Sequence, residues 1–386
     1  MKNPRLDSIL TLILASILIL PSLTMANQLT SSPNAVDELW VGEHGDFFSK
    51  CTLERTILGK DGSVRLAFSS NAEVSTGTVT TPFLKLEFPA NELCPSWNVR
   101  HPTGSGFTVE LRMRGDGNTS RWYFVGAYGD VPTSSTRLRS RDDYGRVDVD
   151  YLLLNKPMDE FQYRVTFFSA RRDSLPAVVR LFLAYSNTTE DEALYTSRTA
   201  GKAPIAATAP ELKREVPFYS QRKVRKEIAG QVCCPTSLAM VTNSLGNPTS
   251  LTQVIERNHD PVTKIYGNWP HTTQTAFELG FVSYVQRFRT LDQARYQIEK
   301  EGPFIISIRA SRGELINAPL QSTRGHVIIL RGYTKDGDFW VSDPYGQEAK
   351  DGQGIYTADE IQKCWLDKGG VGIILLAKGR SSVLRF

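Results

Sequence analysis

The sequence predicts a multi-domain protein in which an N-terminal all-β, jelly-roll-like sandwich precedes an α+β domain. Residues 34–187 form a series of strand-like segments separated by turn signals, whereas residues 214–386 alternate helical and strand-like segments. Residues 188–213 are rich in Ala, Thr, Pro and charged residues, a composition typical of a linker. The 386 residues, of which 40% are hydrophobic and 22% charged, are enough for two globular domains with real cores.

The first 26 residues have the features of a signal peptide. Lys2 and Arg5 form a basic start, residues 9–20 are an apolar run, and residues 24–26 offer small side chains at the two positions that a signal peptidase reads. The apolar run is shorter than the roughly 20 residues that span a bilayer. We therefore expect a secreted or periplasmic protein without a membrane span after processing.

The front region, residues 34–187, predicts a β-sandwich because strand-like segments follow one another without helical stretches. In residues 107–114, three apolar side chains alternate with three charged ones, which is typical of a strand with one face in water. The strand-like segments are LWVGEHG, SVRLAFS, GTVTTPFLKLEF, FTVELRMRG, RWYFVGAYG, RVDVDYLLL, FQYRVTFFS and VVRLFLAYS. Eight such segments favour a jelly-roll-like sandwich.

The rear region, residues 214–386, predicts helices first and then strands, the order of an α+β domain. Thr357 and Glu360 form a capping box that marks the start of the last helix. The expected helices cover residues 234–245, 251–258, 272–279, 290–301 and 357–366, and the expected strands cover residues 303–308, 326–332 and 338–342.

Three residues in the rear region have the order and the settings of a thiol hydrolase. Cys233 stands at the expected start of a helix, where the positive end of the helix dipole favours a thiolate. His326 opens a strand-like run, and Asp343 follows another. Cysteine as nucleophile, histidine as general base and acid, and a carboxylate that orients the imidazole together hydrolyse amide bonds.

A glutamine side chain is expected to complete this candidate site. Gln221 precedes Cys233 by twelve residues, and its side-chain amide is a candidate donor to the oxyanion, together with the backbone N–H of Cys233. Gln231 is closer in sequence and is the competing candidate.

The other cysteines leave several alternatives open. Cys51 and Cys94 are candidates for a disulfide in an oxidising compartment, and Cys364 either pairs with Cys234 or is a buried apolar residue. A metal site built from the rear cysteines and His326 is disfavoured, because no pair has the gap of two to four residues that zinc sites use.

No cofactor is expected. A calcium site at the acidic turns of the front region is less favoured than a solvated loop; the residues concerned are Asp142, Asp143, Asp148 and Asp150.

The rear region resembles the papain-like cysteine peptidases of the bacteriocin-processing type (the C39-like peptidases). The resemblance covers most of residues 216–376 and rests on VPFYSQ, CCPTSLAMV, EGPFIISI, GHVIILRGY and SDPYG. It implies a bacterial papain-like α+β fold, Cys233 as nucleophile, His326 and Asp343 as its partners, and Gln221 in the oxyanion hole. Cys234 stands where that family usually has glycine.

The front region is similar to β-sandwich modules found ahead of such peptidase-like domains. These modules suggest a carbohydrate or cell-wall ligand, for which Trp97, Trp122, Tyr123 and Tyr128 are stacking candidates; the alternative is that they are core or strand-face residues. A net charge of +4 and the lack of a basic patch interleaved with aromatic residues argue against a nucleic-acid partner.

The sequence therefore predicts an exported cysteine peptidase or amidase that acts on a peptide or protein substrate through a thioester acyl-enzyme. Transfer of the acyl group to an amine instead of water stays open. The alternative from another class is a catalytically silent binding protein for cell wall or glycan that keeps the peptidase-like fold.

Overall fold

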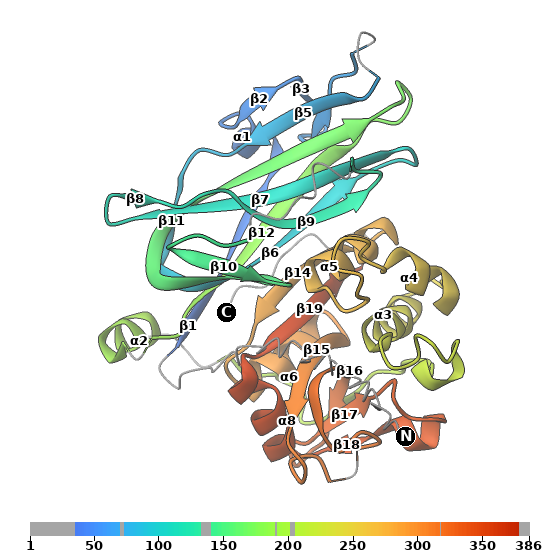
Figure 1. The fold of residues 1–386 in the computed structure, drawn as a ribbon. Helices are drawn as coiled ribbons and strands as arrows, with labels where there is room; N and C mark the ends of the chain where they lie inside the picture. Colours follow the sequence, from blue (N-terminus) through green and yellow to red (C-terminus); the bar gives the residue numbers. More distant parts are fainter. Residues whose placement is uncertain are drawn as a thin grey trace, which may run out of the picture.

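The computed structural model describes residues 35–69, 73–132, 140–189, 191–200, 205–316 and 318–377. The predicted signal peptide lies outside these residues and stays a prediction. Figure 1 shows a strand-rich front part in the upper half of the view and a rear part of helices and strands in the lower half. The strand-rich character predicted for the front region is confirmed.

The front part contains β1 (Val36–Glu43), α1 (His44–Phe48), β2 (Thr52–Glu54), β3 (Thr56–Leu58), β4 (Val64–Leu66), β5 (Ser75–Thr80), β6 (Leu84–Arg100), β7 (Ser105–Gly115), β8 (Asn118–Thr119), β9 (Tyr123–Gly129), β10 (Gly145–Asp148), β11 (Tyr151–Ser169) and β12 (Ala177–Asn187). The expectation of a front part without helices is wrong at α1. This single helical turn follows β1 directly and buries Phe48 in the core, so tertiary packing decides its conformation.

The long strand β11 holds the front part together. Its first half pairs with β6 and β10, and its second half pairs with β5 and β7, in each case antiparallel. The alternation predicted for residues 107–114 is confirmed on β7, where Val109, Leu111 and Met113 are fully buried and the charged residues between them are partly exposed. One face of β7 therefore lines the core and the other faces solvent.

The segment that joins the two parts contains α2 (Glu192–Thr199). The rear part contains β13 (Leu212–Lys213), the 3₁₀ helix η2 (Gln221–Lys223), α3 (Cys233–Ser244), α4 (Leu251–Arg257), α5 (Trp269–Glu278), β14 (Val282–Arg287), α6 (Leu291–Lys300), β15 (Phe304–Ala310), β16 (Thr323–Tyr333), β17 (Phe339–Ser342), α7 (Ala349–Gly352), β18 (Gln353–Tyr356), α8 (Ala358–Cys364), η3 (Leu366–Lys368) and β19 (Val371–Leu376).

The five helices and three strands predicted for the rear region are present, with ends shifted by a few residues. The capping box of α8 also forms: the Thr357 hydroxyl accepts from Glu360 N–H, and the Glu360 side chain accepts from Thr357 N–H. The structure also contains β13, β14, β18 and β19, which were not predicted. These strands form by pairing with strands that are distant in the sequence. The local alternation of apolar and polar residues carries no information about such pairing.

The rear sheet has the strand order β14-β19-β15-β16-β17-β18, and β13 pairs with β16. Neighbouring strands are antiparallel. The expected helix at residues 234–245, observed as α3, packs on β16, and Ser237 Oγ donates to Val327 O at 3.3 Å. The order of the sheet therefore brings β16, β17 and the start of α3 into one neighbourhood.

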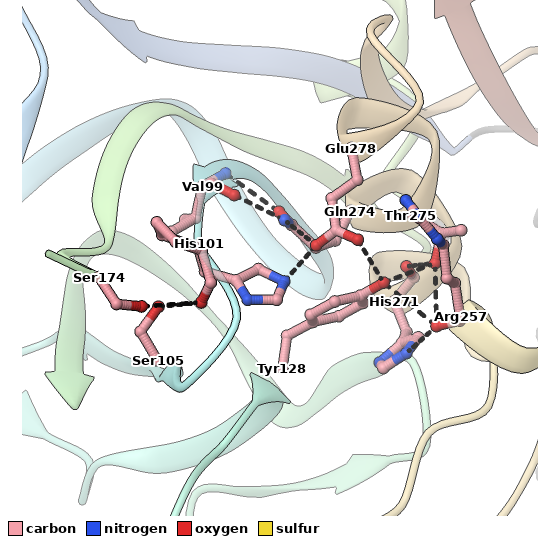
Figure 2. A network of polar contacts seen from close by, with 11 residues as sticks. Val99, His101, Ser105, Tyr128, Ser174, Arg257, His271, Gln274, Thr275 and Glu278 are labelled. Atoms are coloured by element: carbon pink, nitrogen blue, oxygen red, sulfur yellow. Dashed lines mark hydrogen bonds and ion pairs between the residues drawn. The ribbon is translucent and has the colours of Figure 1, made fainter. Parts of the chain in front are cut away.

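The front part docks on α5 and β14 through a network of buried polar contacts. Figure 2 shows the side-chain amide of Gln274 bonded to both backbone groups of Val99, with N···O distances of 3.0 and 2.7 Å. His101 contacts the carboxylate of Glu278, and Tyr128 donates to the second oxygen of the same carboxylate at 3.2 Å. These bonds satisfy polar groups that lose contact with water at the interface.

Apolar contacts join the same surfaces. The rings of Phe182 and Tyr284 stack with centroids 5.1 Å apart, and those of Tyr151 and Trp269 stack at 6.0 Å. The side of α5 away from the front part contacts α3, where Cys234 Sγ lies 3.2 Å from Thr272 Oγ1. The front part therefore supports the helix against which α3 rests.

Candidate active site

Cys233 is the first residue of α3, as predicted. The N-cap residue, Val232, provides no side-chain cap, so the first N–H groups of the helix are not used by a neighbouring side chain. The Cys233 side chain is half-buried, whereas the following residues of the helix are buried. Pro235 suits this first turn because its missing N–H would have no partner in the helix. A half-buried thiol thus lies at the positive end of a helix dipole.

The rotation of α3 turns Cys233 toward β16. Ser237 lies one turn farther along the helix, on the same face as Cys233, and its hydroxyl is bonded to the carbonyl of Val327. Val327 is the residue after His326. The bond therefore fixes the helix with its Cys233 face toward the imidazole.

His326 and Asp343 form a buried pair. Ile329 of β16 pairs with Ser342, the last residue of β17. If this antiparallel register continues by one residue, Asp343 lies opposite Ile328. Ile328 is two residues from His326, so Asp343 and His326 lie on the same face of the sheet. Nε2 of His326 is 2.7 Å from Oδ1 of Asp343, and both side chains are almost completely shielded from water. When Nε2 carries the hydrogen, Nδ1 is the nitrogen available to the thiol.

The environment of His326 favours the imidazolium. Burial lowers its pKa, but the Asp343 charge and hydrogen bond, together with the interaction with Cys233, outweigh burial and raise the pKa to about 10. His326 is accordingly protonated at neutral pH. The structure thus brings Cys233, His326 and Asp343 together as one interacting group.

Tyr356 completes the surroundings of Asp343 and was not predicted as a site residue. Its hydroxyl donates to Asp343 Oδ2 at 3.0 Å, and the backbone N–H of Tyr345 donates to Oδ1 at 2.8 Å. Burial, followed by the Asp343 charge, raises the pKa of Tyr356 well above its ordinary value, so the hydroxyl remains a donor. Tyr356 comes close only through the pairing of β17 with β18, and the sequence around it carries no signal of this role.

Gln221 lies between the segments that carry Asp343 and Cys233. Its backbone N–H donates to Pro344 O at 2.9 Å, and its side-chain Nε2 donates to Ala229 O at 2.7 Å. The side chain is buried, and its Oε1 has no hydrogen-bond partner. The competing Gln231 is exposed and turns back toward Glu227 O at 3.5 Å. Of the two glutamines, Gln221 is the one that the structure buries in this neighbourhood.

All five cysteines are free thiols. Neither alternative left open by the sequence, a Cys51–Cys94 or a Cys234–Cys364 disulfide, is formed. Burial raises the pKa of Cys51 to about 11 and that of Cys364 to about 12, and it raises the pKa of Cys94 and Cys234 further. These four thiols are therefore poor nucleophiles near neutral pH.

The candidate sugar-stacking residues of the front part are mostly unavailable. Trp97, Tyr123 and Tyr128 are buried, in agreement with the alternative that they are core residues. Trp122 is half-buried, and the guanidinium groups of Arg112 and Arg164 lie 4.6 and 4.3 Å from its ring centroid. The arrangement therefore leaves no open aromatic platform among these four residues.

Metal binding and membrane insertion find no support among the described residues. They contain no group of three or more His, Cys, Asp or Glu side chains that is able to hold a metal ion. Among the same residues there is no helix with the length and apolar character needed to cross a membrane.

Two family models match the chain, one over each part. Residues 213–373 match the model of the Peptidase_C39 like family, and residues 57–186 match the model of the Peptidase C39 N-terminal domain. The candidate site residues all fall within the first of these ranges; they are Gln221, Cys233, His326 and Asp343. No curated protein matches the chain.

Several solved structures are similar to parts of the chain. A double glycine motif protease from an AMS/PCAT transporter, in complex with the leader peptide, is 18% identical, covers 42% of this chain and 92% of its own, and has a TM-score of 0.31. The peptidase domain of Streptococcus ComA, a bi-functional ABC transporter, is 14% identical over 43% and 99% of the two chains, with a TM-score of 0.31. The xylan-binding module CBM86 from Roseburia intestinalis is 9% identical over 39% and 96%, with a TM-score of 0.19.

Proposed function

Because the chain carries a Peptidase_C39-like domain behind a C39 N-terminal domain, we propose that it is a papain-like cysteine peptidase or amidase. Cys233 is the nucleophile, His326 the general acid and base, and Asp343 the residue that orients His326. The observation that carries the proposal is the buried imidazole that contacts Asp343 at 2.7 Å and interacts with the Cys233 thiol. A buried imidazolium beside a thiol at a helix N-terminus is the arrangement that produces a reactive thiolate.

In the first half of the proposed reaction the Cys233 thiolate attacks the carbonyl carbon of the scissile amide. The carbonyl oxygen takes the negative charge and is stabilised by the first N–H groups of α3 and the side-chain amide of Gln221. The His326 imidazolium gives its proton to the leaving nitrogen as the C–N bond breaks. The products of this half are a free amine and a thioester on Cys233.

In the second half a water molecule attacks the thioester. Neutral His326 takes a proton from this water, the tetrahedral intermediate collapses, and the carboxylic product leaves. The Cys233 thiolate and the His326 imidazolium are then restored. Throughout, Asp343 keeps the hydrogen on Nε2 and so leaves Nδ1 to exchange the proton with thiol, amine and water.

Alkylation of the cysteines tests this proposal without knowledge of the substrate. Iodoacetamide is expected to modify Cys233 much faster than Cys51, Cys94, Cys234 or Cys364, because burial suppresses the thiolate at those four positions. His326→Ala is expected to slow the modification of Cys233 by about 100-fold or more at neutral pH. Mass spectrometry after proteolysis measures the rate at each cysteine. A Cys233 that reacts no faster than the buried thiols contradicts the proposal.

Gln221→Ala is expected to lower kcat by about 100-fold to 1,000-fold, the effect of one lost oxyanion donor. Its matched control is Gln231→Ala, which is expected to leave kcat nearly unchanged because the Gln231 side chain is exposed. Both variants are expected to keep rapid alkylation of Cys233, since neither touches the imidazole. Steady-state kinetics on a cleaved peptide compares them, and equal losses in the two variants contradict the assignment of Gln221.

A further inference from the structure

The loop that connects Gln221 to Cys233 is strongly basic. Between them, residues 222–232 contain four cationic side chains and a single anionic one, Glu227. The four cations, Arg222, Lys223, Arg225 and Lys226, are all exposed. Hydrolysis of an amide by Cys233, His326 and Asp343 does not require these positive charges. They therefore indicate a separate role.

Hydrogen bonds at both ends tie this loop to the candidate site. At its beginning, Gln221 N–H is bonded to Pro344 O, next to Asp343. The Gln221 side chain then reaches across the loop to Ala229 O, four residues before Cys233. Inside the loop, the N–H groups of Ile228 and Ala229 both donate to Arg225 O at 3.1 Å. The loop is therefore a closed, internally bonded turn that holds its cations in the segment leading into Cys233.

The first of these cations contacts a tyrosine ring that in turn contacts the imidazole. The Arg222 guanidinium is 5.4 Å from the centroid of the Tyr345 ring, and that ring meets the His326 ring edge-on with centroids 6.2 Å apart. Arg324 is also exposed, two residues before His326 and near the start of β16. Exposed positive charges are thus carried by two different segments, the loop after Gln221 and the residues just before His326.

Most of this charge is not neutralised by the protein. Lys223 forms an ion pair with Glu348 at 2.7 Å. Within the residues that the structure describes, Arg222, Arg225, Lys226 and Arg324 form no ion pair with a carboxylate. We name these four residues the cationic rim.

Resting on the proposed function, we propose that the enzyme selects peptides with Asp or Glu residues beside the scissile bond, which the cationic rim binds. Arg supplies forked donors that match a carboxylate, and Lys supplies a compact charge. In the proposed complex a peptide bound at Cys233 extends past the loop and Arg324, so that acidic side chains near its reacting carbonyl meet the rim. The rim also raises the local concentration of such a peptide, an effect that salt screens over about 8 Å at physiological ionic strength.

The charge at Cys233 is measurable with small thiol reagents of opposite sign. An anionic methanethiosulfonate (the ethylsulfonate) is expected to react faster than a cationic one (the ethyltrimethylammonium) in the wild-type protein. In the double variant Arg225→Glu, Lys226→Glu this ratio of rates is expected to fall by about 10-fold or more. The matched control, Lys50→Glu with Lys60→Glu, reverses two exposed cations in the front part and is expected to leave the ratio unchanged because distant charges are screened.

A second measurement uses peptides and tests the substrate class itself. A short glutamate-rich peptide is expected to protect Cys233 from iodoacetamide better than the same peptide with glutamine, and added salt is expected to remove the difference. The advantage is expected to disappear in the Arg225→Glu, Lys226→Glu variant and to persist in the Lys50→Glu, Lys60→Glu control. Equal protection by the two peptides, or an unchanged reagent ratio in the rim variant, overturns the proposal.

The outcomes also separate this inference from the proposed function. A Cys233 that iodoacetamide modifies no faster than the buried thiols overturns the proposed function, whatever the reagent ratio is. If Cys233 is reactive but the ratio of the rates of the anionic and cationic reagents is the same in wild type and in the Arg225→Glu, Lys226→Glu variant, only the acidic-peptide inference is overturned. Rim-dependent binding to phosphatidylglycerol vesicles without protection of Cys233 by the glutamate-rich peptide assigns the charge to a membrane surface and also overturns the inference.

Discussion

Cys233→Ala is expected to lower the turnover of a peptide substrate by about 10⁶-fold, whereas Cys234→Ala retains most of it. The two residues are neighbours in the chain, but α3 turns by about 100° between them. Cys233 is half-buried beside His326, and Cys234 is fully buried with its Sγ on Thr272 of α5. Removing the first thiol removes the attacking atom, while removing the second leaves a small vacancy between two helices.

A library of fluorescence-quenched peptides provides the substrate for this comparison. Cys234→Ala serves as the matched control and is expected to cost about 1 kcal/mol of folding free energy, which thermal unfolding measures. Equal losses in the two variants contradict the assignment of Cys233 as nucleophile. A wild-type protein that binds a peptide or glycan and cleaves nothing, with binding unchanged in Cys233→Ala, supports the silent binding protein instead.

Asp343→Asn is expected to lower kcat by about 10⁴-fold while the fold is retained. An asparagine amide preserves the shape of the side chain but removes the negative charge and no longer keeps the hydrogen on Nε2 of His326. It also removes the main cause that raises the pKa of His326, so that burial, which lowers this pKa, dominates in the variant. The imidazolium is then lost at neutral pH, and the thiolate loses its partner.

The same change alters the pH dependence of stability. The pKa of His326 is raised from 6.5 to about 10 in the folded protein, so the folded state binds this proton more tightly than the unfolded state. The resulting stabilisation is fully present below about pH 6.5, declines above it, and is lost as the pH rises through about 10. The difference in unfolding free energy between wild type and Asp343→Asn is therefore expected to shrink between pH 6.5 and 10.

NMR titration of the His326 ring and urea unfolding at a series of pH values measure these two effects. Tyr356→Phe is the matched control, because it removes one hydrogen bond to Asp343 and keeps the carboxylate charge. Its effect on kcat is expected to be roughly tenfold, the worth of a single hydrogen bond. A His326 that titrates at the same pH in wild type and Asp343→Asn contradicts the role given to Asp343.

Most helices and strands were predictable because the residue patterns that specify them span only a few neighbouring residues. The helix that begins at Cys233, the capping box at Thr357 and the strand around His326 each depend on neighbours within a few residues. The side-chain alternation of β7 follows in the same way from the two-residue period of a strand. The exception is α1, where the burial of Phe48 overrides the local preference.

Other features depended on contacts that the sequence does not display. The choice of Gln221 over Gln231 follows from which side chain is buried, and both lie in one loop of similar composition. Tyr356 reaches Asp343 only because β18 pairs with β17. Three of the four stacking candidates of the front part, Trp97, Tyr123 and Tyr128, were resolved as buried residues only when the packing of β6, β9 and the rear part was known.

The sequence by itself determined which residue types are present, in which order, and on which kind of element. These properties placed Cys233 at a helix start, His326 on a strand and Asp343 at a strand end. Only the tertiary structure decided that the three interact, because their contact requires the register of β16 with β17 and the rotation of α3 set by Ser237. It also decided how strongly His326 holds its proton, since burial and a neighbouring charge act through space over a few ångströms, whatever the separation along the chain.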